Sequence, residues 1–112
     1  MLLPEGSVEW FKADRGAWHR GGAGDPGRTR GFQLWIALPP DRELEPAESI
    51  YQASQDIRRI GPASALLGRL GAVSSSLPAP SPMNYLALRP KAGEVLALSA
   101  AGRSQRLLDC TQ

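Results

Sequence analysis

The stretch from Phe32 to Leu38 carries the clearest strand pattern in the chain, and it constrains the fold more than any other feature. Its even-numbered positions share one apolar face: Phe32, Leu34, Ile36 and Leu38. Trp35 and Ala37 add apolar surface to the opposite face, so both faces are expected to be covered. This pattern predicts a central strand of a sandwich or closed barrel, which ends where Pro39 and Pro40 follow it.

Turn-forming residues fill much of the remaining sequence, since 12 of the 112 residues are glycine and 10 are proline. Many turns favour an all-β or mixed architecture over a helical bundle. Residues 6–18 predict a strand, a turn and a second short strand, and residues 63–78 predict a short strand, a glycine turn and a polar loop. Residues 85–88 and 95–98 predict the two strands of a hairpin.

Three further segments carry different expectations. The stretch 41–49, which is rich in acidic residues, predicts an extended segment along the surface. In residues 48–60 the isoleucines recur near helical spacing, which predicts a short helix, and Pro46 and Pro62 limit it to a few turns. The proline-rich stretch 77–85 predicts a rigid connector between two structural units.

Charge and cysteine content limit the function classes. The formal net charge is +2 and the arginines are scattered, whereas a nucleic-acid-binding protein concentrates its basic residues on one face. Cys110 is the only cysteine, so no disulfide can form within the chain, as in reducing compartments. No apolar run reaches the length of a membrane span, and the N-terminus lacks the basic start of a signal peptide. We therefore expect a cytoplasmic protein without membrane contact.

His19 is the only histidine and the first candidate for chemistry. A metal site needs three or four ligands that converge from neighbouring segments. The acidic residues near His19 in sequence are Glu9, Asp14 and Asp25. Composition alone favours a loop histidine over a metal ligand.

Other candidate sites have weaker patterns. The glycine-rich loop 21–31, with Arg28 and Arg30, does not connect a strand to a helix as phosphate-binding loops do. The serines 74–76 have no neighbouring histidine and lack the strained turn of a hydrolase nucleophile. The carboxylates Glu43, Glu45 and Glu48 are typical of a solvated surface.

Four segments in fixed order resemble the pirin family of bicupins. They read GSVEWFKADRGAWH, GRTRGFQLWIALPP, ESIYQ and PSPMNYLALRPKAGEV, and the resemblance covers about residues 5–98. The strongest part of the resemblance is GFQLWIALP following the tryptophan-to-histidine stretch at the family's spacing. The resemblance implies a partial cupin fold, with jelly-roll-like strands from two β-barrels, a connecting segment and at most short helices.

The same resemblance implies what each candidate residue does. Pirins hold an iron-type metal through two histidines of an H-x-H-R-G motif and through a later histidine and glutamate, and some act as quercetin 2,3-dioxygenases. His19 falls on the later histidine, Gly21 on the glutamate, and Asp14 on the first glycine of the G-x-G turn. The H-x-H-R-G motif belongs upstream of Gly6. Iron or another divalent metal is thus implied by resemblance, and no stable cofactor is expected to bind.

The resemblance to the pirin family predicts three segments and a function. Residues 1–40 correspond to the last part of the first barrel, residues 41–82 to the connector and short elements, and residues 83–112 to the start of the second barrel with a divergent tail. The favoured function is that of a truncated, non-catalytic pirin-like protein that self-associates through exposed strand edges. The alternatives are a metal-dependent quercetin 2,3-dioxygenase-type oxidoreductase and a transcription-cofactor or protein-interaction module.

Overall fold

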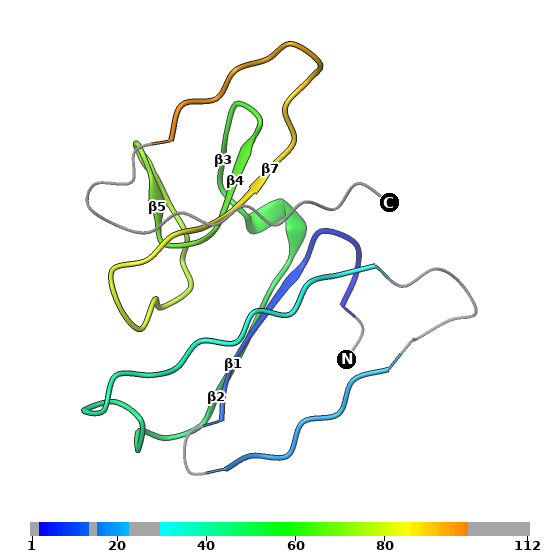
Figure 1. The fold of residues 1–112 in the computed structure, drawn as a ribbon. Helices are drawn as coiled ribbons and strands as arrows, with labels where there is room; N and C mark the ends of the chain where they lie inside the picture. Colours follow the sequence, from blue (N-terminus) through cyan, green and yellow to red (C-terminus); the bar gives the residue numbers. More distant parts are fainter. Residues whose placement is uncertain (1–2, 14–15, 23–29, 99–112) are drawn as a thin grey trace.

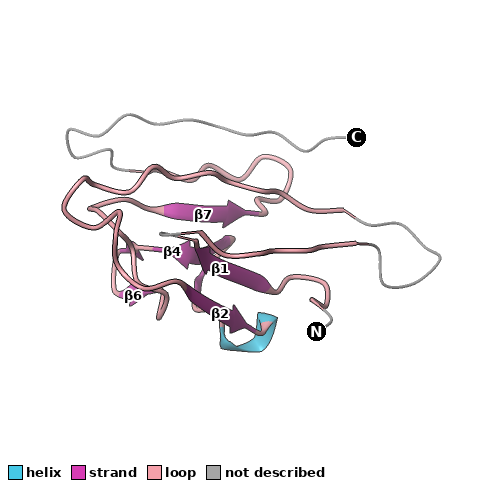
Figure 2. Cartoon of the chain, turned by 90° about the horizontal axis from the view of Figure 1, so that it is seen from below, coloured by secondary structure: helices cyan, strands magenta, loops and turns pink. Residues whose placement is uncertain are grey.

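The protein is all-β in the computed structural model, which describes residues 3–13, 16–22 and 30–98. Its strands form three separate antiparallel sheets (Figure 1). The helical content of these residues is one short 3-10 turn, η1 (Ser54–Asp56), close to the end of β2 in Figure 2. No helix in this part of the chain is long and apolar enough to cross a membrane. The all-β prediction is confirmed, and the cupin assignment stays a prediction.

The first sheet joins segments that are distant in sequence. β1 (Val8–Lys12) pairs with β2 (Glu48–Gln52), with Val8 opposite Gln52 and Lys12 opposite Glu48. In Figure 1 the two strands lie side by side in the lower part of the molecule. The first predicted strand is thereby confirmed. The second strand predicted before Trp18 is absent, because residues 16–22 are in no ladder.

The predicted helix over residues 48–60 is mostly wrong. Its first five residues form β2, in which Ile50 lies directly opposite Trp10 of β1. β-branched and aromatic side chains pack well across antiparallel strands, and this pairing outweighs a weak helical periodicity. The acidic segment is also not extended throughout, since residues 40–44 form a turn before β2 begins.

The prediction of a central strand at Phe32–Leu38 is wrong. These residues belong to no strand, and Phe32 and Trp35 are 59% and 85% exposed. A strand needs a partner for its N–H and C=O groups, and these residues form no ladder with any described strand. The alternation of residue types in Phe32–Leu38 therefore suits a strand, but the segment has no partner strand in the described chain.

The second sheet has the order β3–β4–β7 and lies in the upper part of Figure 1. β3 (Arg59–Ile60) and β4 (Ala63–Leu67) are joined by a tight turn, and β7 (Tyr85–Leu88) pairs with the other side of β4. A small sheet of β5 (Arg69–Leu70) and β6 (Val73–Ser74) follows β4. The short strand and glycine turn predicted within residues 63–78 are confirmed.

The predicted hairpin between residues 85–88 and 95–98 is half right. β7 forms as expected, but residues 95–98 are in no strand. β7 pairs instead with β4, where Ala63 lies opposite Leu88 and Ala65 opposite Leu86. β4 offers a buried apolar row, and Val95 is 92% exposed, so the long-range partner buries more apolar surface. This ladder joins residues of the predicted connector segment to residues of the predicted second barrel.

The core is small and is built around β4. Alternate residues of that strand are buried, as are two apolar side chains from flanking segments. Together the buried apolar residues are Ile57, Ala63, Ala65, Leu67 and Leu77. Gln52 at the end of β2 is the buried polar residue, and its Nε2 donates a hydrogen bond of 2.8 Å to Ser76 Oγ. The core thus reaches from β2 to the segment that follows β6.

A charged cluster holds the turn at residues 40–44 against β1. Glu45 Oε2 accepts a hydrogen bond of 2.9 Å from Lys12 Nζ, and Arg42 Nε donates to Glu45 Oε1 at 3.2 Å. Arg42 also donates to the Pro80 carbonyl at 3.1 Å. The cluster links three segments that are distant in sequence, and the hydrogen bonds from Arg42 and then Lys12 lower the pKa of Glu45 from 4.5 to about 2.

We expect this carboxylate to contribute to acid sensitivity. Because the folded-state pKa of Glu45 lies below its unfolded value, its stabilisation is complete above pH 4.5 and is lost as the pH falls toward 2. Thermal melts followed by circular dichroism should show a falling melting temperature across this window. Glu45→Gln should melt with a shallower dependence on pH there, and an unchanged slope in the variant would contradict the assignment.

Candidate functional site

His19 lies on the segment 16–22, which runs over one face of β1. Strand alternation places Glu9 and Phe11 on the same face of β1, and both contact the imidazole. The Phe11 and His19 rings are 4.8 Å apart between centroids and tilted by 35°. The His19 side chain is 41% exposed. Contact with Phe11 therefore holds the ring against this face of β1, with part of the ring open to solvent.

Glu9 is the carboxylate that the structure brings to His19. Its Oε1 atom lies 3.6 Å from His19 Nδ1, beyond the distance of a direct hydrogen bond. That oxygen is buried and has no hydrogen-bond partner. The resemblance to the pirin family gives Glu9 no role. In the sequence, the two-residue spacing of Glu9 and Phe11 within a predicted strand indicates that both side chains lie on one face.

Position 21 also lies near the imidazole. A Cβ atom built on Gly21 would be 4.0 Å from His19 Nε2. A carboxylate side chain at this position would start beside the ring, as the resemblance implies for the family. Gly21 supplies no ligand atom from a side chain, so the second carboxylate is missing at this place.

Several of the other sequence candidates have structural contacts, the carboxylates Glu43 and Glu48 are exposed, and some candidates fall outside the described chain. Ser75 Oγ donates to the Leu66 carbonyl at 2.9 Å, and Ser76 Oγ accepts the hydrogen bond from Gln52. Glu45 is held in the charged cluster with Lys12 and Arg42. The residues outside the described ranges are Asp14, Asp25, Arg28, Cys110 and the tail from Ala100.

Among the described residues, Glu9 is the one further side chain of ligand type placed beside His19. Catalytic metal centres use three protein ligands and leave a position open for water or substrate. Residues 3–13, 16–22 and 30–98 contain no group of three or more His, Cys, Asp and Glu side chains placed to hold a metal ion. His19 and Glu9 form a pair, and no metal-dependent step can be derived from a pair alone.

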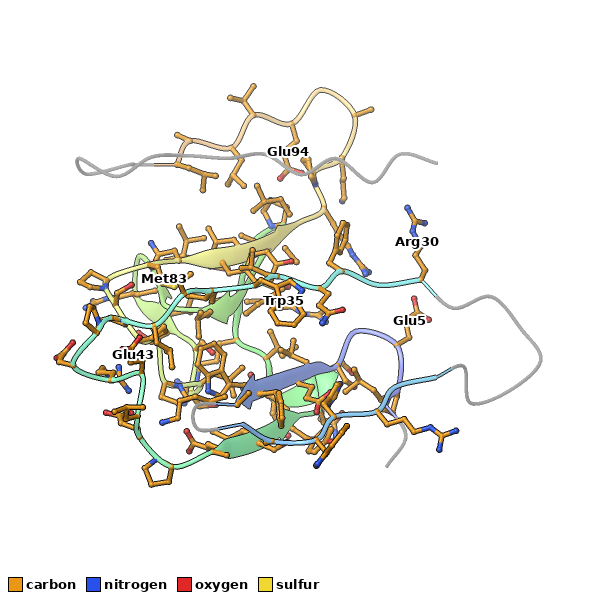
Figure 3. The ribbon with its side chains drawn as sticks, turned by 60° about the horizontal axis from the view of Figure 1, so that its bottom comes forward. Glu5, Arg30, Trp35, Glu43, Met83 and Glu94 are labelled. Atoms are coloured by element: carbon orange, nitrogen blue, oxygen red, sulfur yellow. The ribbon has the colours of Figure 1, made fainter. Side chains whose placement is uncertain are left out.

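A second feature of this half of the molecule is an exposed aromatic strip. We define the strip as Phe32, Leu34 and Trp35, which are 59%, 44% and 85% exposed. Figure 3 shows Trp35 on the chain segment that passes between β1 and β7 in that view. Exposed aromatic side chains such as Phe32 and Trp35 are enriched at protein-interaction surfaces.

Comparisons with known proteins assign no family. The chain matches no protein-family model, and searches of curated proteins and of solved structures give no significant match.

Proposed function

We propose that this chain is a pirin-like protein that acts by self-association and not by metal catalysis. The single observation that carries the proposal is the exposed aromatic strip. Trp35 leaves 85% of its surface in water while β1, β2 and β7 each have an unpaired edge among the described strands. Burial of aromatic side chains and pairing of open edges both favour association.

The strand pairing explains why a second copy of the chain could bind the segment that carries the aromatic strip. Residues 32–38 have the alternation of a strand but no ladder of their own, and β1 forms a ladder on one side only among the described strands. An extended segment can add to such an edge through main-chain hydrogen bonds, with alternate side chains filling pockets. Two copies of the chain supply both the segment and the edge.

Sedimentation velocity tests this proposal. The wild-type chain should show association that increases with concentration. Phe32→Ser combined with Trp35→Ser should weaken it at least about tenfold, because buried aromatic residues carry most of the energy of interfaces.

Val95→Ser is the matched control for this test. Val95 is 92% exposed and lies on a different segment, so its substitution should leave association unchanged. A wild-type chain that remains a monomer over the whole concentration range would contradict the proposal.

One observation favours the enzyme alternative, a quercetin 2,3-dioxygenase-type oxidoreductase. Glu9 brings a buried carboxylate oxygen without a hydrogen-bond partner to within 3.6 Å of the imidazole of His19. Histidine nitrogen and carboxylate oxygen are ligands that iron and zinc accept. This alternative requires further ligands, so it is the second candidate.

A further inference from the structure

The outer face of the second sheet carries two unpaired arginines. Arg59 lies opposite Ser64, and Ser64 lies opposite Ala87, so these three residues share one face across β3, β4 and β7. The Arg89 N–H donates to the Pro62 carbonyl at 2.8 Å, which extends the ladder and places Arg89 on the same face as Ala87. We call Arg59 and Arg89 the basic face.

Nothing on that sheet covers the guanidinium groups of the basic face. Arg59 and Arg89 are exposed, and their side chains form no hydrogen bond or ion pair within the described structure. The residues between them, Ser64 and Ala87, are small, so both guanidinium groups are accessible from one direction. Two accessible guanidinium groups on one face suit a ligand with paired carboxylates.

Carboxylates of this kind occur at the turn before β2. Asp41 and Glu43 are exposed on either side of Arg42. The Arg42 guanidinium is hydrogen-bonded to Glu45 and to the Pro80 carbonyl, so it is not the counter-ion of Asp41 or Glu43. We call Asp41 and Glu43 the acidic turn. Figure 3 shows Glu43 on the side of the molecule away from Glu94.

The two charged surfaces lie on different parts of the molecule. Figure 1 places the turn at residues 40–44 at the lower left, and β3 and the end of β7 in the upper half. The whole sequence has the same division, with acidic residues in excess before Ser54 and basic residues in excess after it. One copy therefore presents complementary charges at separate places, and it cannot satisfy both within itself.

We infer that the basic face of one copy binds the acidic turn of a second copy. This inference rests on the proposed self-association and adds a direction to it, because the contact joins two different surfaces. A contact between unlike surfaces leaves one of each free at the ends, so assembly continues beyond a dimer unless it closes into a ring.

Charge reversal with complementation tests the inference by sedimentation velocity. At about 0.02 M salt the wild-type chain should form species larger than a dimer, and about 0.5 M salt should weaken this association, because exposed charges are then screened. Arg59→Glu with Arg89→Glu should prevent the assembly, and so should Asp41→Lys with Glu43→Lys. An equimolar mixture of the two double variants should restore it, because each reversed surface then meets its opposite.

The outcomes separate this inference from the proposed function. Association that ignores salt and both charge reversals, but is lost with Phe32→Ser and Trp35→Ser, overturns the charged contact and supports the aromatic strip alone. A mixture of the double variants that fails to associate also overturns it. A wild-type chain that is monomeric at both salt concentrations contradicts the inference and the proposed function together.

Discussion

Gly68→Ala is expected to destabilise the protein by about 3 kcal/mol or more, which is a large part of the stability of a small domain. Gly68 has φ of +80°, a left-handed conformation that costs other residues about 1–2 kcal/mol. A Cβ there would overlap the Met83 carbonyl oxygen and Asn84 Oδ1 and would lie 2.9 Å from Asn84 Cα. Backbone atoms cannot move aside as a flexible side chain can, so the contact between β4 and the start of β7 must open.

Urea unfolding measures this effect, and Gly93→Ala is its matched control. Gly93 has φ of +77°, nearly the same as Gly68, but a Cβ there meets no atom within 4 Å. Its substitution should therefore cost about 1 kcal/mol, the conformational part alone. Equal losses in the two variants would show that the close approach of residues 83–84 to Gly68 is not formed.

Leu67→Ala is expected to cost about 2–4 kcal/mol, because it leaves a cavity in the core. Leu67 is 3% exposed at the end of β4 and lies opposite Tyr85 of β7. The other buried residues of β4, Ala63 and Ala65, are small. Few side chains can therefore close over the space that the leucine leaves, and most of the packing energy is lost.

Chemical denaturation of Leu67→Ala and Val95→Ala measures the free energy of unfolding of each variant. The comparison distinguishes the loss of a buried side chain from the loss of an exposed one. Val95 is 92% exposed, so its truncation should change the free energy of unfolding by less than about 0.5 kcal/mol. Similar small losses at both positions would mean that β4 does not carry the core.

Sequence reasoning succeeds where a strand is recognisable from its own residues. The strands at Val8–Lys12, Ala63–Leu67 and Tyr85–Leu88 have local apolar patterns and flanking turn signals, and all three form. Frequent glycine and proline indicate the all-β class, which the structure confirms. These features depend on side-chain periodicity and backbone preference, which short sequence windows contain.

It fails where the outcome depends on which strand pairs with which. Phe32–Leu38 has the pattern of a strand and forms none. In residues 48–60 the isoleucines recur near helical spacing, yet Glu48–Gln52 within this segment pairs with β1. Residues 95–98 form no ladder with β7, whose partner in the described chain is the distant strand β4. Pairing is decided by the total apolar area that distant segments bury together, and local periodicity does not contain this information.

The candidate site shows the same division. The sequence identifies His19 as the residue to examine, and the resemblance gives it a ligand position. Neither predicts the proximity of Glu9 Oε1 or the contact with Phe11, since both depend on how residues 16–22 fold back over β1. Glu9 precedes His19 by ten positions, and only the fold brings the pair together.

Calorimetric titration of the purified chain with Fe²⁺ and Zn²⁺ tests the central claim, that His19 is not part of a catalytic metal centre. The account predicts no tight, stoichiometric binding to the wild-type chain, since two ligands do not make a structural or catalytic site. Gly21→Glu adds a carboxylate beside His19 Nε2 and should raise the affinity. Tight one-to-one binding by the wild type that is lost in both His19→Ala and Glu9→Gln would contradict the account and favour the oxidoreductase.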